Sequence, residues 1–288
     1  MATKKMRQWN GWDIVIYFVL ITFCILALYP FLYTLAGSFN TGEDYSYGGV
    51  WLFPREFTLG NYQTVLGDNR FWTSFFNTIL RTVIGTFASL VFTTFVAYAM
   101  SRPNLPYKTF FRTANLITMF FSGGLIPYYL MINFVGLYDS FLVYIIPSLY
   151  SVYNMIVVSN FFRGIPEELH ESAIIDGATE FVIWWKFYLP LSKPVLATVG
   201  LWIAVGHWNS YMPTLLYTSR SESIWTLQYY LMRIIKDSSV PEGMPIELVT
   251  PQTLTFAAMV VSIVPIVCVY PSLQKYFAKG ATVGSLKG

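Results

Sequence analysis

The residues whose types and spacing point most directly to a function lie in a polar stretch between two apolar spans. Glu171-Ser172-Ala173 is followed by Gly177 and then by Leu189-Pro190. A carboxylate, two small residues and a glycine suit a surface that another protein approaches closely, because small side chains and a tight turn leave room for the partner. The pattern therefore predicts a docking loop rather than a catalytic site.

This loop has the signals of two short helices. Pro166 with three glutamates after it presets the backbone and places negative charge where a helix begins. Gly177 is the natural left-handed position to end that helix. Residues 178–188 then form a second helix, which Pro190 is expected to stop.

Along the first of these helices, Leu169, Ala173 and Asp176 recur at close to the helical period. They predict a stripe of small and apolar atoms, flanked by Glu167, His170 and Glu171, that docks into a partner's groove. The alternative is an amphipathic helix that merely lies on the membrane surface.

The composition is that of an integral membrane protein. The 288 residues are 55% hydrophobic and 11% charged, with a mean hydropathy of +0.50. Apolar runs of sufficient length predict an all-α membrane protein with six transmembrane helices in a single domain, 1–288. The expected spans are residues 13–37, 72–100, 109–132, 139–162, 191–217 and 253–275, with a cytoplasmic loop at 163–190 and extracytoplasmic loops at 39–71 and 218–252.

The distribution of basic residues sets the expected orientation, because short cytoplasmic loops are enriched in lysine and arginine. If both termini are cytoplasmic, most of the 18 basic residues fall inside: Lys4, Lys5, Arg7, Arg102, Lys108, Arg112, Arg163, Lys186, Lys193, Lys275, Lys279 and Lys287. Arg55, Arg70, Arg81, Arg220, Arg233 and Lys236 stay outside. The same choice places the 163–190 loop in the cytoplasm.

Several chemistries are excluded by missing patterns. The sequence has no Gly-x-x-x-x-Gly-Lys-Ser/Thr loop to bind the phosphates of ATP, so the energy for transport is expected from another chain or from an ion gradient. No carboxylate lies well inside a span, as an ion-coupled carrier usually needs. Arg81 is the one cation within a span, and it is expected to snorkel to the outer interface.

No catalytic, metal or nucleic-acid pattern is present. His170 and His207 belong to no nucleophile or metal-ligand motif, so the chain is not expected to be an enzyme. Cys24 and Cys268 both fall in apolar spans, where a thiol is usually a small hydrophobe. The net charge of +3 reflects the basic inner face.

The loop resembles the EAA loop of binding-protein-dependent ABC importer permeases. Glu171, Ala173, Gly177, Leu189 and Pro190 match that motif, whereas Ser172 replaces an alanine and Phe187 replaces an aliphatic residue. The resemblance implies a type I ABC importer permease fold, with Glu171, Ser172, Ala173, Asp176, Gly177, Leu189 and Pro190 coupling it to an ATPase. Glu171 then either caps its own helix or pairs with a basic residue of the ATPase.

The resemblance covers nearly the whole chain and implies a set of partners. These are a second, MalF-like permease, two cytoplasmic ATPase subunits that hold ATP and Mg, an extracytoplasmic solute-binding protein and the bilayer of a prokaryotic cytoplasmic membrane. No cofactor is expected on this chain itself.

A narrower resemblance concerns the substrate. Phe120 to Pro127 and Val205 to Tyr211 resemble the LplC/YtcP-like branch of MalG-like carbohydrate permeases, which implies an oligosaccharide and possible uronate units. His207, Trp208, Asn209 and Tyr211 offer the aromatic faces and hydrogen-bonding groups that sugars need. At helical spacing His207 and Tyr211 share a face while Trp208 turns elsewhere; packing between helices is the alternative role.

Two questions stay open at the level of sequence. A non-sugar solute, such as an amino acid, peptide or phosphate, is an alternative cargo, and an ion-coupled secondary transporter is an alternative mechanism. Ser122-Gly123-Gly124 before Pro127 either breaks the third span into a gate or lets two helices pack closely, and close packing is the favoured interpretation.

Overall fold

The computed structural model describes residues 11–237 and 249–285, with side chains as far as Cys268. Within these residues all regular structure is helical, apart from one isolated antiparallel bridge between Asn40 and Phe57. The chain divides into two compact units. One unit combines the described residues up to Asp68 with those from Arg233 to Val264, and the other combines Asn69–Met232 with those from Pro265 onward.

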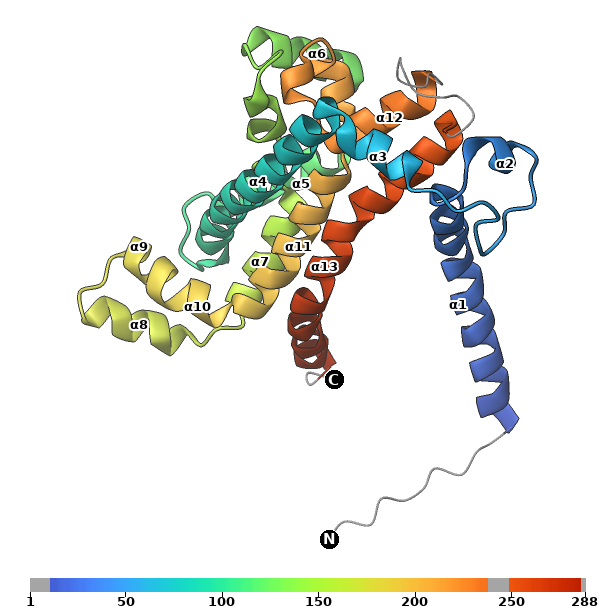
Figure 1. Cartoon of the computed structure of the whole chain (residues 1–288). Helices are drawn as coiled ribbons and strands as arrows, with labels where there is room; N and C mark the ends of the chain where they lie inside the picture. Colours follow the sequence, from blue (N-terminus) through green and yellow to red (C-terminus); the bar gives the residue numbers. More distant parts are fainter. Residues whose placement is uncertain (1–10, 238–248, 286–288) are drawn as a thin grey trace. The chain divides into compact units, whose positions relative to one another are not determined.

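The first unit contains α1 (Gly11–Ser38), α2 (Gly42–Ser46), α3 (Gly60–Gly67) and the beginning of α13 (Pro251–Ser285) (Figure 1). The segment after α1 is organised by the buried amide of Asn40. Its Nδ2 donates to Asp44 Oδ2 at 2.8 Å, and its Oδ1 accepts from the backbone N–H of Arg55 at 2.8 Å. The Asn40 hydrogen bond, together with the Arg55 guanidinium 3.0 Å away, holds the pKa of Asp44 below its ordinary value despite partial burial.

The second unit holds most of the helices. They are α4 (Asn69–Ser101), α5 (Lys108–Phe120), α6 (Leu125–Phe134), η1 (Phe141–Tyr144), η2 (Ile146–Ser148), α7 (Val152–Phe162), α8 (Glu167–Ile175), α9 (Glu180–Ile183), η3 (Trp184–Tyr188), α10 (Leu189–Leu191), α11 (Lys193–Asn209), η4 (Thr214–Thr218), η5 (Glu222–Ile224) and α12 (Leu227–Asp237), which ends in the first unit.

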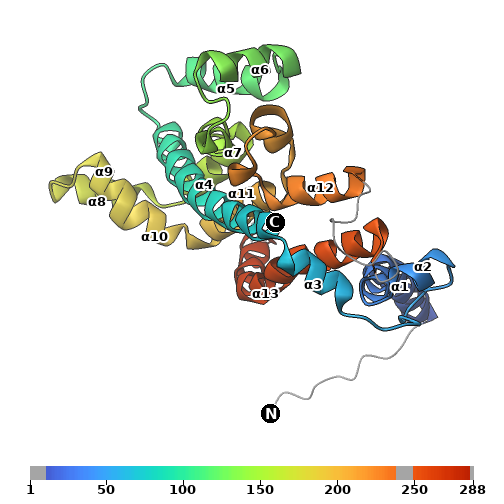
Figure 2. The same cartoon turned by 45° about the horizontal axis from the view of Figure 1, so that its top comes forward.

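The centre of this unit is α4, which packs against α7 and α11. Most residues of its buried face are small or carry a hydroxyl group, and small residues let helix backbones approach closely. At Gly85 a methyl group would lie 2.5 Å from the His207 ring of α11. Figures 1 and 2 both show α8 to α10 grouped to one side of α4, away from α6.

By length and composition, six spans are present if each bent helix pair is one span. Three are single helices: α1, α4 and Pro251–Cys268. Three are bent pairs: α5 with α6 at 115°, Phe141–Ser148 with α7 at 47°, and Glu180–Leu191 with α11 at 86°. The prediction of an all-α membrane protein with six spans is confirmed, but the third, fourth and fifth spans are interrupted.

The break in the third span corrects one interpretation. Among the residues that the structure describes, a methyl group added to Gly123 or Gly124 would meet only Pro127, at 4.0 Å, so no other helix of this part of the chain packs closely there. Gly124 has a φ of +87°, a conformation that costs glycine little. The Ser122–Gly124 segment therefore bends the chain, and the prediction that it serves close helix packing is wrong.

Candidate functional site

The polar loop folds into a helix, a tight turn and a second helix. Pro166 caps the start of α8, and Gly177 has a φ of +80° just after its end, so both sequence signals are confirmed. The Gly177 N–H donates to Ile174 O and the Ala178 N–H donates to Ala173 O, both at 2.9 Å. This pair of bonds is a Schellman motif, which satisfies the last carbonyls of the helix.

The second helix differs from its prediction at both ends. It begins at Glu180 and continues through Pro190 to Leu191. Residues Trp184–Tyr188 form a π-helical turn just before the proline. The wider turn relieves the clash between a proline ring and the preceding carbonyls, so the sharp bend falls at Ser192 instead of at Pro190.

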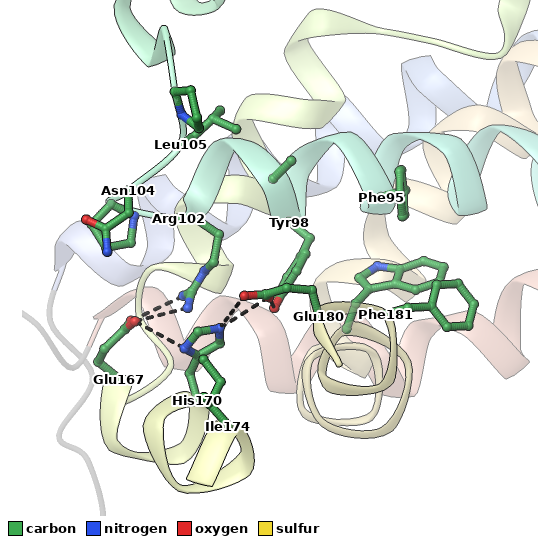
Figure 3. A pocket seen from close by; sticks show the side chains of 14 residues that line it. Phe95, Tyr98, Arg102, Asn104, Leu105, Glu167, His170, Ile174, Glu180 and Phe181 are labelled. Carbon is green, nitrogen blue, oxygen red and sulfur yellow. Dashed lines mark hydrogen bonds and ion pairs between the residues drawn. The ribbon is translucent and has the colours of Figure 1, made fainter. Parts of the chain in front are cut away.

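A bidentate ion pair ties α8 to the end of α4. Arg102 Nη1 and Nη2 donate to the two carboxylate oxygens of Glu167 at 3.0 and 3.2 Å (Figure 3). Nη2 also donates to the Tyr188 hydroxyl at 2.7 Å, and the guanidinium lies over the rings of Tyr98 and Tyr188. Arg102 thereby links α4, α8 and η3 through one side chain.

A second connection runs through the buried His170. Its Nε2 lies 3.3 Å from both carboxylate oxygens of Glu180, and its Nδ1 lies 3.6 Å from Glu167 Oε1 (Figure 3). The Tyr98 hydroxyl of α4 donates to the same Glu180 carboxylate. The carboxylates of Glu167 and Glu180 are thus held by Tyr98 of α4, by Arg102 just after it and by His170 of α8.

These polar groups line one part of a cavity of about 670 Å³ between α4 and the loop. Most of the cavity wall is apolar and includes Phe95, Ile174, Phe181 and Trp184. Beneath it lies a continuous core formed by Ala97, Tyr98, Met100, Met155, Val158, Phe162, Ala173, Ile183, Trp184, Tyr188 and Val199. The loop is therefore packed on α4, α7 and α11 as part of one hydrophobic cluster.

The residues matched to the coupling motif fall into two groups. Glu171, Ser172, Asp176, Gly177 and Pro190 are exposed, whereas Leu189 is half-buried and Ala173 is buried at 4% exposure. The predicted stripe of Leu169, Ala173 and Asp176 is wrong, because Ala173 faces the chain's own core. The outer face of α8 instead carries Glu168, Glu171, Ser172 and Ile175, and Ile175 is 85% exposed.

Of the residues predicted for a substrate path, His207 lines a cavity of about 370 Å³ in the second unit. Trp208 is buried against the Phe75 ring, and Asn209 and Tyr211 are exposed. The prediction that His207 and Tyr211 share a helical face is wrong, because α11 ends at Asn209 and Ser210 is extended. Helical periodicity does not continue across that break.

Arg81 also differs from expectation. It is 3% exposed and lies twelve residues into the 33-residue α4, about 18 Å from the start of the helix at 1.5 Å per residue. Its Nη1 donates to Ser210 O at 2.9 Å, and its guanidinium lies 4.7 Å from the centre of the Tyr144 ring. It therefore does not snorkel to an interface.

The sequence did not reveal the network around Arg102. Arg102 lies 65 residues from Glu167 and 86 from Tyr188, so no local spacing joins them. The one available signal was a basic residue at a span end that the sequence predicted to be cytoplasmic, and the positive-inside rule already accounts for such a residue.

Residues 12–283 match the family described as "Binding-protein-dependent transport system inner membrane component". The chain belongs to this family. It is 39% identical over 267 residues to the protein LplC of Bacillus subtilis, covering 91% of this chain and 90% of that protein. It is 37% identical to the polygalacturonan/rhamnogalacturonan transport system permease protein YtcP of the same organism, covering 96% of this chain and 98% of that protein.

A solved structure extends the similarity to three dimensions. A chain of a bacterial ABC transporter involved in the import of the acidic polysaccharide alginate superposes with a TM-score of 0.88 at 35% identity. The match covers 94% of this permease and 100% of that chain. The type I importer permease fold and an inner-membrane transport role are thereby established for this chain.

Proposed function

We propose that this permease forms half of the translocation path of an ATP-driven importer for oligosaccharides, and that α8 couples it to separate ATPase subunits. The family supplies the general role, and the similarity to YtcP and to the alginate importer chain supports a carbohydrate cargo. ATP and Mg are bound by the partner ATPases, and a second permease and a solute-binding protein complete the importer. The termini and the 163–190 loop face the cytoplasm.

The arrangement of α8 is the observation that carries the coupling role. Its inner face is held by the Glu167 ion pair with Arg102, just after α4, and by the contact of His170 with Glu180 of α9. Its outer face presents the Glu171 carboxylate beside the exposed Ile175. Within the described residues the Glu171 side chain makes no hydrogen bond or ion pair, so it does not cap its own helix. A free carboxylate next to an apolar side chain suits a partner with a basic rim around an apolar pocket.

Purification of the chain from its native membrane tests this proposal. We expect an ATPase and a second permease to copurify with wild type, and the ATPase to be lost with Ile175→Asp, because a charge in the docked pocket is left unpaired. Tyr107→Asp is the matched control: it changes another large side chain, 82% exposed, in the loop between α4 and α5. Wild type recovered alone, or equal ATPase recovery from all three proteins, would contradict the coupling role.

A further inference from the structure

The cavity of about 370 Å³ that contains His207 lies entirely within the second unit, away from the coupling loop. Its lining includes the tyrosines Tyr128, Tyr144 and Tyr217, the amide of Asn154 and the guanidinium of Arg81. Flat aromatic faces beside amide and hydroxyl groups suit the C–H faces and hydroxyls of a sugar ring. These tyrosines and the amide would be sufficient for a neutral sugar, which does not require the guanidinium.

Arg81 carries a buried positive charge with no counter-ion in the described part of the chain. Its recorded partners are a neutral backbone carbonyl, Ser210 O, and the face of the Tyr144 ring. Its Nε is buried and has no hydrogen-bond acceptor. Burying an arginine without a carboxylate is costly, so such residues inside a membrane segment usually serve a ligand or pathway.

The arginine is held rigidly in this position. The Tyr144 hydroxyl beneath it donates to Ile224 O at 2.8 Å and lies within hydrogen-bond distance of Thr214 and Thr218. The ring cannot turn away without breaking these contacts, and Ser210 O holds Nη1 of the guanidinium by a hydrogen bond. An arginine whose orientation is set in advance loses little entropy when it meets an anion.

We propose that Arg81 binds the carboxylate of a uronic acid residue as the oligosaccharide passes through this cavity, and so selects acidic over neutral sugars. This inference rests on the proposed function. A carboxylate supplies the two acceptor oxygens that match a guanidinium edge, and it neutralises the buried charge only while substrate is present. His207 and Asn154 then contact the ring hydroxyls beside it.

The test is uptake by the complete importer reconstituted in vesicles, with trigalacturonate and its fully methyl-esterified form as paired probes. We expect Arg81→Gln to lower uptake of the acid by about tenfold or more relative to the ester, since one partner of a buried charge pair is lost. Arg81→Lys should recover part of the acid uptake, because lysine keeps the positive charge but lacks the paired N–H donors of the planar guanidinium. Arg220→Gln, at an exposed arginine of the same unit, should change neither.

Asn154→Ala separates charge recognition from general sugar binding, and we expect it to reduce uptake of both probes equally. Equal loss of both probes in Arg81→Gln, with ATPase activity retained, would assign Arg81 a structural role and overturn the inference while the importer function stands. Wild-type uptake of the ester but not the acid would also overturn it. Failure of wild type to import either probe or a neutral oligosaccharide would overturn the proposed function itself.

Discussion

At the scale of single residues, the 163–190 loop depends on side chains that join segments far apart in the sequence. Arg102 reaches Glu167 with two hydrogen bonds and Tyr188 with a third. A lysine at this position would keep the charge but not the planar fork or the stacking over two tyrosine rings. We therefore expect Arg102 to act through its geometry more than through its charge.

We predict that Arg102→Lys lowers the free energy of unfolding by about 1–2 kcal/mol, mainly through the lost Tyr188 hydrogen bond and ring contacts. A double-mutant cycle with Glu167→Gln should give an interaction energy between the two side chains of only about 0.5–1 kcal/mol, because the Glu167 side chain is 45% exposed and water screens the pair. Thermal and denaturant unfolding of the purified chain in detergent would measure both values.

Arg112→Lys is the control for this cycle, since Arg112 is also a basic residue next to a span end but is exposed. Its effect should stay within about 0.5 kcal/mol. An Arg102→Lys effect no larger than that of the control would show that Arg102 contributes only its charge.

At the scale of elements, sequence signals located the short helix of the loop well but misjudged which face it buries. Pro166 and Gly177 act on their own backbone, so their roles are visible locally. Whether Ala173 or Ile175 faces inward depends on what α8 packs against. Ala173 belongs to a core that includes α7 and also α4, which ends more than 60 residues earlier in the sequence. Periodicity defines a stripe but not its partner.

The sequence did not predict the breaks within the spans for a similar reason. Hydropathy over about 20 residues is satisfied equally by one straight helix and by two helices bent at 86° or 115°. The bend at Ser192 and the end of α11 at Asn209 decide that His207, but not Tyr211, lines the cavity. The cavity around Arg81 follows from these bends and was not predictable from composition.

The contact between α4 and α11 gives a prediction at this scale. Gly85→Ala should lower the free energy of unfolding by about 1–3 kcal/mol, because the new methyl group would lie 2.5 Å from the buried His207 ring. The two helices must separate or the ring must move into the cavity. Thermal unfolding in detergent would measure the loss.

Gly200→Ala is a matched control on the same interface. Its methyl group would meet Leu90 Cδ1 at 3.1 Å, the end of a flexible and only partly buried side chain. The gain of about 1 kcal/mol in helix propensity offsets that contact, so little net change is expected. Equal effects of the two substitutions would show that His207 yields as easily as Leu90.

At the scale of the whole molecule, coupling requires that movement of the docked α8 reach the transmembrane helices. The ion pairs of Arg102 and His170 and the common core with α4, α7 and α11 favour movement of these elements as one body. Packed interfaces resist continuous deformation, so a rigid lever transmits a displacement without losing it in local adjustments. In the proposed importer, nucleotide binding on the partner ATPase would change access to the path by moving this body.

Distances between spin labels test this rigid movement in the complete importer. Labels on Leu169→Cys in α8 and Val83→Cys in α4, both at exposed positions, report on the second unit once Cys24 and Cys268 are replaced by serine. We expect the distance distribution to be the same without nucleotide and with bound ATP. Adding Arg102→Ala should broaden it, because α8 loses its bidentate contact and its link to Tyr188. A nucleotide-dependent shift in the intact protein would mean that α8 moves against α4, and that coupling acts by deformation of the loop instead of by a lever.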